Sequence, residues 1–234
     1  MHRLNWLFTC SSLVVLLVTA ERYSFTTKIL LHPGNFLRLH EFVQMNLIIL
    51  LTVILPFLLL RDVSGNFELV KKRTGFWWML LFLIGVYFYA TGNGVHEIGS
   101  FFFNQYCDTK NFSDILCTGF FINDYYYGNI LYFIGGTLMI LPLLFLEHTK
   151  QFFQMDRRNM VILYVNGIFY SLAIFAYSAF DRVAIGLIYS LTIMVVSDIL
   201  LFHHWKKRNR IPVILYTSVC YTLGALGALY VWVF

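Results

Sequence analysis

The chain has 234 residues, of which 59% are hydrophobic and 19% aromatic but only 12% charged. An average soluble domain is about 25% charged, whereas uncharged windows of about 20 residues recur here, long enough to cross a hydrocarbon core as helix. This composition excludes an ordinary soluble domain and predicts an integral membrane protein whose partners are membrane lipids. The net charge of +5 therefore requires no nucleic-acid partner, and protein partners stay unknown.

The first apolar run, residues 6–20, follows Arg3 and ends in the small residues Thr19 and Ala20. That ending suits cleavage of a signal peptide, whereas the run counted from Leu4 is close to spanning length. Both readings fit, and we predict that segment 1–20 is a retained first helix. The next segment, 21–40, mixes basic and aromatic side chains, so we expect it to lie in the exoplasmic membrane interface.

Six later apolar runs predict further membrane-spanning helices. Their ranges are 41–60, 76–95, 125–146, 160–180, 183–202 and 211–234. We therefore predict an all-α, polytopic helix bundle with seven transmembrane helices, or six after signal cleavage. The whole chain, 1–234, forms one transmembrane domain in this prediction.

The Lys and Arg residues predict the orientation of the bundle, because they are enriched on the cytoplasmic side of membrane proteins. Twelve fall on one side: Arg3, Arg61, Lys71, Lys72, Arg73, Lys150, Arg157, Arg158, Lys206, Lys207, Arg208 and Arg210. Five fall on the other: Arg22, Lys28, Arg38, Lys110 and Arg182. We predict a cytoplasmic N-terminus, provided that the first helix is retained, and an exoplasmic C-terminus.

Segment 104–124 then forms an exoplasmic loop. Cys107 and Cys117 can close it with a disulfide, which needs an oxidising compartment. Asn111-Phe112-Ser113 is a glycosylation sequon in the same loop, which agrees with that side of the membrane. Cys10 and Cys220 lie in apolar runs, where thiols pack as small hydrophobic groups.

Several polar residues share one level of the membrane when helices are counted from their cytoplasmic ends. They are His40, Glu41, His96, Glu97, Asn123, Asp124 and Asp181. His40, His96 and Asp124 supply the three ligands of a catalytic divalent metal such as zinc, and Glu97 or Glu41 supplies a general base. The glycines around Asn93 predict a break in the third helix beside this site.

The same polar residues can also be interpreted without a catalytic or metal-binding role. Histidine and carboxylate side chains are least costly at helix ends near water, and Asp124 is placed to cap the helix that follows. No HExxH motif or other dense set of metal ligands is present. Convergence of the predicted ligands is therefore an assumption of the metal-site hypothesis.

The cytoplasmic side offers a second polar set. It contains Glu147, His148, Asp198, His203 and His204. The His203 segment is typical of a basic stretch at anionic lipid headgroups. Asp198 lies inside an apolar helix and needs a partner, for which His148 or Lys206 is the candidate. Paired histidines near each face also permit a two-haem reading.

Three functions follow from these patterns. The first is a metal-dependent enzyme acting on a lipid or lipid-linked substrate at the exoplasmic face. The second is a transporter of a small solute or ion, for which the predicted helix break and Asp198 are the motivation. The third is a non-catalytic membrane partner subunit. The sequence leaves open whether the protein is an enzyme.

Overall fold

The computed structural model describes residues 2–150 and 154–234. Within these residues there is no β-strand, and seven helical spans are long and apolar enough to cross a membrane. This confirms the predicted all-α bundle of a multi-pass membrane protein. Large apolar side chains such as Leu47, Leu83 and Ile199 are exposed on its outer surface, as lipid contact requires.

Five of the seven described spans are longer than the predicted apolar runs, whereas the last two are slightly shorter. The seven spans are α1 (His2–Glu21); α2 (Leu39–Val43) continuing through the π-helical η2 (Gln44–Ile48) into α3 (Ile49–Val63); α4 (Arg73–Tyr106); α5 (Ile115–Phe121) continuing through the π-helical η4 (Ile122–Gly128) into α6 (Asn129–Thr149); α7 (Arg157–Phe180); α8 (Ile185–His203); and α9 (Pro212–Val233). Three short 3₁₀ segments connect them: η1 (Phe25–Lys28), η3 (Leu69–Lys71) and η5 (Trp205–Arg210).

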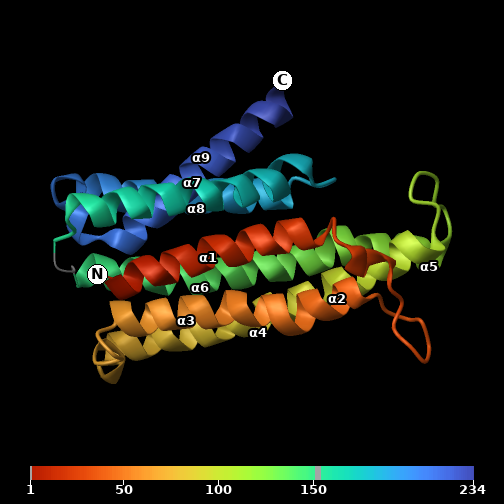
Figure 1. Cartoon of the computed structure of the whole chain (residues 1–234), viewed down its shortest axis with the longest axis horizontal. Helices are drawn as coiled ribbons and strands as arrows, with labels where there is room; N and C mark the ends of the chain where they lie inside the picture. The colour runs from red at the N-terminus through yellow and green to blue at the C-terminus, as the bar shows by residue number, and fades with distance from the viewer. Residues whose placement is uncertain (1, 151–153) are drawn as a thin grey trace.

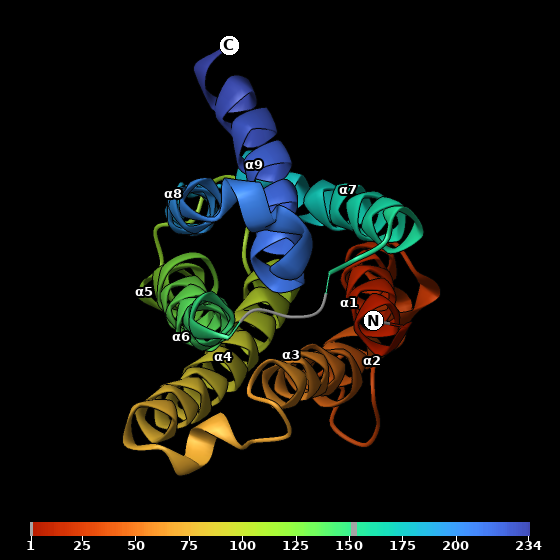
Figure 2. The same ribbon diagram turned by 90° about the vertical axis from the view of Figure 1, so that its left-hand side faces the viewer.

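The long helices follow one another around the bundle (Figures 1 and 2). α1 lies between α3 and α7, α6 lies between α4 and α8, and α9 packs on both α7 and α8. The last turns of α9 lean away from the other helices (Figure 1) and end in the exposed Phe234. The first helix belongs to the core, because Phe8 is fully buried and stacks on Tyr216 of α9, with ring centroids 4.4 Å apart.

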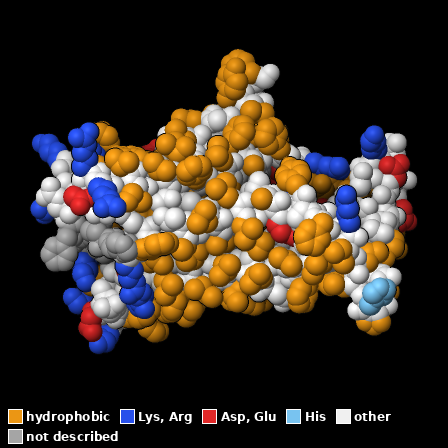
Figure 3. Space-filling model, viewed as in Figure 1, with side chains coloured by type: hydrophobic (Ala, Val, Ile, Leu, Met, Phe, Trp, Pro, Cys, Tyr) orange, Lys and Arg blue, Asp and Glu red, His pale blue; other side chains and the backbone are white. Residues whose placement is uncertain are grey.

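The two ends of the bundle differ in charge. Lys and Arg side chains gather at the left end of Figure 3, whereas the middle is a broad hydrophobic band. We call this left end the basic end; it holds the start of α1 and the end of α3, which are joined by an ion pair of 3.1 Å between Arg3 and Asp62. The opposite end carries Cys107 and Cys117, and we call it the disulfide end.

The predicted break in the third helix is wrong, because α4 runs through it without interruption for 34 residues. Gly92 instead lets two helices approach: an added Cβ would lie 2.2 Å from the backbone nitrogen of Tyr132 on α6. Gly85 and Gly99 repeat this close approach one heptad before and after it. Gly85 and Gly92 permit close packing of α4 on α6, and Gly99 permits it on η4 of the same span, as small residues commonly do between membrane helices.

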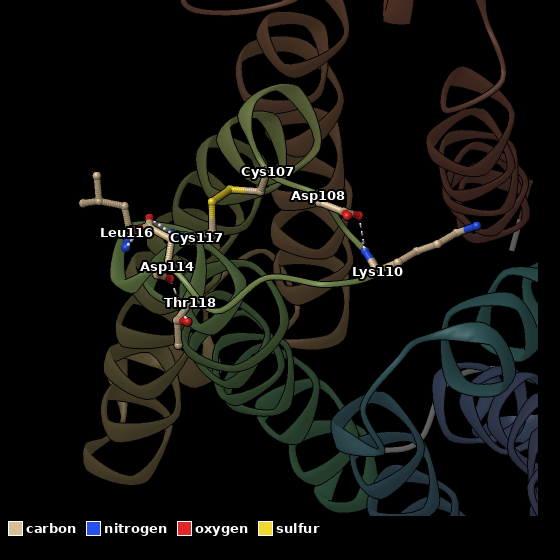
Figure 4. Close-up of a disulfide and its surroundings, with 7 residues drawn as sticks. All are labelled: Cys107, Asp108, Lys110, Asp114, Leu116, Cys117 and Thr118. Atoms are coloured by element: carbon tan, nitrogen blue, oxygen red, sulfur yellow. Dashed lines mark hydrogen bonds between the residues drawn. A yellow bond between two sulfur atoms is a disulfide. The ribbon is translucent and has the colours of Figure 1, made fainter.

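The loop predicted over 104–124 is shorter in the structure. Helix α4 continues to Tyr106, and α5 begins at Ile115 with Asp114 as its N-cap, accepting hydrogen bonds from two backbone amides. Asp124 is therefore inside a helix and is not a cap. The remaining loop is closed by a disulfide between Cys107 and Cys117, with Lys110 between them (Figure 4).

A carboxylate on one span caps another at the basic end. Glu147, near the end of α6, is fully buried and accepts hydrogen bonds from the backbone amides of Val213 at 3.0 Å and Ile214 at 2.7 Å. These amides belong to the first turn of α9, whose N–H groups have no partner within their own helix. Glu147 therefore holds the end of α6 to the start of α9.

Candidate functional site

A cavity of about 740 Å³ lies between the helices. Residues of α1, α3, α4, α6, α7, α8 and α9 contribute to its wall, which extends from Arg182 at the disulfide end to Val213 at the basic end. Six of the predicted site residues line it at the disulfide end: His40, Asn93, His96, Glu97, Asp124 and Asp181. The structure therefore brings these predicted site residues to one space. Glu41 lies beside them but does not line the cavity.

His40 is held between two carboxylates. Its Nδ1 forms an ion pair with Glu21 at the end of α1, and its Nε2 lies 3.8 Å from Oε2 of Glu97 on α4. Glu21 is itself fixed by Thr26 and by Gln44, whose amide donates to it at 3.1 Å. A carboxylate on one ring nitrogen orients a histidine to bind a metal ion through the other nitrogen. In His40 that other nitrogen is Nε2.

His96 has a similar arrangement on α4. Its Nδ1 lies 2.8 Å from Oδ1 of Asp124, which is 1% exposed. Its Nε2 lies 3.5 Å from Nη2 of Arg22. A guanidinium group only donates hydrogen bonds, so this contact favours the tautomer with the proton on Nδ1 and a lone pair on Nε2 that faces Arg22. The pair has the geometry of a histidine general base supported by a carboxylate.

The part of the cavity at the disulfide end, which we call its polar end, has more acidic than basic side chains. Its carboxylates are Glu21, Glu41, Glu97, Asp124 and Asp181, and its guanidinium groups are those of Arg22, Arg38 and Arg182. Glu41 is occupied by Arg38, which donates to it from Nε at 2.8 Å and from its backbone amide at 3.0 Å. Five carboxyl groups against three guanidinium groups leave a surplus of acidic side chains, which suits a cation.

The ligand atoms of His40, Glu41 and Glu97 lie within 4.8 Å of one another, close enough to hold one metal ion. His96 and Asp124 pair with each other instead, so the predicted set of His40, His96 and Asp124 is not one of the three-ligand groups found among the described residues. That assignment stays a prediction. The contacts favour His40 and Glu97 as ligands, and Asp124 as the partner that orients His96.

Asn93 and Asp181 complete the polar end. The side-chain oxygen of Asn93 is buried without a hydrogen-bond partner among the described residues, so it is available to a donor on a bound molecule. Asp181 accepts from Asn129 at 3.1 Å and from the backbone of Arg182 at 2.7 Å. Burial raises the pKa of the Asp181 carboxyl above its ordinary value.

Tyrosines dominate the rest of the cavity wall. They include Tyr89, Tyr132, Tyr170, Tyr177, Tyr189 and Tyr221. Four of the hydroxyls form two pairs, at 2.8 Å between Tyr89 and Tyr132 and at 2.7 Å between Tyr189 and Tyr221. These rings therefore present mainly apolar faces to the cavity. Leu55, Met139 and Leu143 continue this apolar lining.

The remaining predicted site residues, Asp198, His148 and His203, do not line this cavity. Asp198 of α8 accepts hydrogen bonds from Ser218 and from Thr222 of α9, the latter at 3.0 Å. These hydroxyls are its partners, so the predicted partnership with His148 or Lys206 is wrong. His148 and His203 instead belong to a histidine cluster at the basic end.

Glu21, Arg22 and the tyrosines were not predicted from the sequence to belong to the site. Glu21 and Arg22 follow the first apolar run directly, so their depth was readable, but nothing in their spacing shows that they contact His40 and His96. The tyrosines are scattered over several helices, and only tertiary structure brings them together.

No protein-family model, curated protein or solved structure matches this chain. The site is therefore interpreted from its own geometry.

Proposed function

We propose that this protein is a membrane-embedded enzyme acting on a lipid or lipid-linked substrate. The observation that carries the proposal is the cavity itself, which joins a charged, titratable end to a long wall of tyrosine and aliphatic side chains. An amphipathic molecule matches this division: its polar headgroup fits among His40, His96 and Asn93, and its hydrocarbon part fits along the tyrosines.

His96 is the proposed general base. Its unprotonated Nε2 would remove a proton from a water molecule as the water attacks an ester bond of the headgroup, and would return that proton to the leaving oxygen. Asp124 would hold the ring and stabilise the imidazolium that forms in between. The buried Asn93 would donate to or accept from the headgroup and fix its position.

A divalent metal such as zinc fits the cluster beside this base. His40 Nε2 and Glu97 Oε2 are separated by a distance suited to two ligands of one ion, and Glu21 orients His40 from the outside. A bound ion would polarise the ester oxygen. Glu41 is the third group within reach, although Arg38 holds it.

The disulfide end is proposed to face the exoplasmic side. Most Lys and Arg side chains gather at the opposite end (Figure 3), and the positive-inside bias assigns that end to the cytoplasm. The substrate would then be bound from the outer leaflet.

Lipid turnover in nanodiscs tests the proposal. Purified protein would be incubated with a total membrane lipid extract and Zn²⁺, and each lipid class followed by mass spectrometry. The wild type should deplete one class and accumulate its product, His96→Gln should slow this by roughly 100-fold or more, and the distant, exposed Glu68→Gln should match the wild type. No depletion by the wild type, or equal depletion by His96→Gln, would overturn it.

Transport is a second candidate, favoured by the length of the cavity wall from Arg182 to Val213. A permeation path needs such a span, whereas a headgroup site needs only one end. Solute flux into proteoliposomes with no change in any lipid class would favour transport over the enzyme.

A further inference from the structure

The basic end holds a cluster of three histidines that the proposed enzyme does not use. His148 lies in the last turn of α6, His203 ends α8, and His204 follows directly. The ring centroids are 4.7 Å apart for His148 and His204, 4.9 Å for His203 and His204, and 5.6 Å for His148 and His203. Three imidazoles from two helix ends therefore converge at one point.

One nitrogen of each ring can be directed to a common centre. Such atoms of the three rings lie within 4.8 Å of one another, and His204 Nε2 is 2.8 Å from His148 Nδ1. Zinc–nitrogen bonds near 2.0–2.1 Å in tetrahedral geometry separate two ligand nitrogens by about 3.4 Å. The rings therefore need to move only slightly to hold an ion.

We propose that His148, His203 and His204 bind a transition-metal ion of the zinc class and thereby tie the end of α6 to the end of α8. Three imidazoles with no carboxylate select zinc, nickel or copper over magnesium or calcium, which prefer oxygen ligands. A fourth position stays open to solvent, because His203 is exposed and faces a surface cavity also lined by Lys206 and Lys207.

The neighbouring groups give the ion a structural role. Glu147 precedes His148 and holds the first turn of α9 through Val213 and Ile214. A metal on His148 would therefore fasten α8 to the same point of α6 that already holds α9. The nearby lysines repel a cation, so binding should be weaker than in a closed zinc site, and an anionic fourth ligand such as chloride would relieve that repulsion.

Cobalt(II) binding tests this site, because the ion substitutes for zinc and absorbs visible light when tetrahedrally coordinated. Full-length protein in detergent would be titrated with Co²⁺ alone, and bound metal counted after dialysis. His203→Ala removes an exposed side chain and should preserve the fold. The substitution should remove one equivalent of bound Co²⁺, or raise the dissociation constant of that equivalent by at least about 10-fold. The loss of an outer-shell partner alone costs as much.

His32→Ala is the matched control, since His32 is also exposed but lies near the disulfide end. It should bind as the wild type does, and His148→Ala should behave as His203→Ala does. Metal held at the disulfide end would remain in both basic-end variants, which separates this site from the proposed active site. Equal stoichiometry and affinity in the wild type and His203→Ala would overturn the proposal.

Discussion

Gly92 of α4 faces Tyr132 of α6 so closely that an added Cβ would lie 2.2 Å from the tyrosine backbone nitrogen. Backbone cannot yield as a flexible side chain does, so Gly92→Ala should force the two helices apart. We expect a loss of about 1–3 kcal/mol in the free energy of unfolding, the usual cost of overpacking. Thermal unfolding in detergent measures it.

Gly94→Ala is the control, because no atom lies within 4 Å of a Cβ built there. It removes a helical glycine without a clash and should leave stability unchanged or raise it by up to about 1 kcal/mol. Equal destabilisation by both substitutions would show that flexibility, and not close packing, explains the glycines.

Asp124→Asn tests the carboxylate behind His96. The variant keeps the size of the side chain but no longer stabilises an imidazolium, so lipid turnover should fall by roughly 100- to 10,000-fold while the protein stays folded. Asp108→Asn, in the exposed loop, should turn over lipid as the wild type does. Activity in Asp124→Asn close to that of the wild type would remove Asp124 from the mechanism.

The disulfide can be checked through Lys110, which lies between Cys107 and Cys117 (Figure 4). Trypsin cleavage after Lys110 should leave two peptides joined until a reductant is added. The free cysteines Cys10 and Cys220 should be alkylated after denaturation without reduction. Separate, alkylated Cys107 and Cys117 peptides from unreduced protein would contradict the disulfide.

The Asp181 carboxyl should make the free energy of unfolding fall as pH rises. Burial raises its pKa in the folded protein, so its protonated form is favoured on folding. This contribution is complete below the pKa of the unfolded chain and is lost as pH passes through the higher folded pKa. The measurement is the Tm of Asp181→Asn minus the Tm of the wild type. This difference should be larger at pH 7 than at pH 4, and an equal difference at both pH values would contradict the prediction.

Hydropathy was sufficient to predict the seven spans, because apolar length is a local property of the sequence. It failed from Thr91 to Ser100, where a polar, glycine-rich segment remains helical. The reason is tertiary: Gly92 and Gly99 are needed for the close approach of the span formed by η4 and α6, and a single sequence does not show which helix will be the neighbour.

The depth of the site residues was predictable in the same way. Counting along helices placed His40, His96 and Asp124 at one level, and the structure places all three on one cavity. Their pairing was not predictable, since His40 contacts Glu21 and His96 contacts Asp124 through the lateral order of the helices. That order depends on packing between spans far apart in sequence.

The capping of α9 by Glu147 has a consequence for biogenesis. Among the spans that the structure describes, α9 leaves the ribosome last, and its first-turn amides acquire their acceptor from Glu147, which lies 66 residues before Val213 and 67 residues before Ile214. A membrane offers such amides little water. The correct placement of α9 therefore depends on α6 being already inserted, so Glu147 links the order of synthesis to the order of assembly.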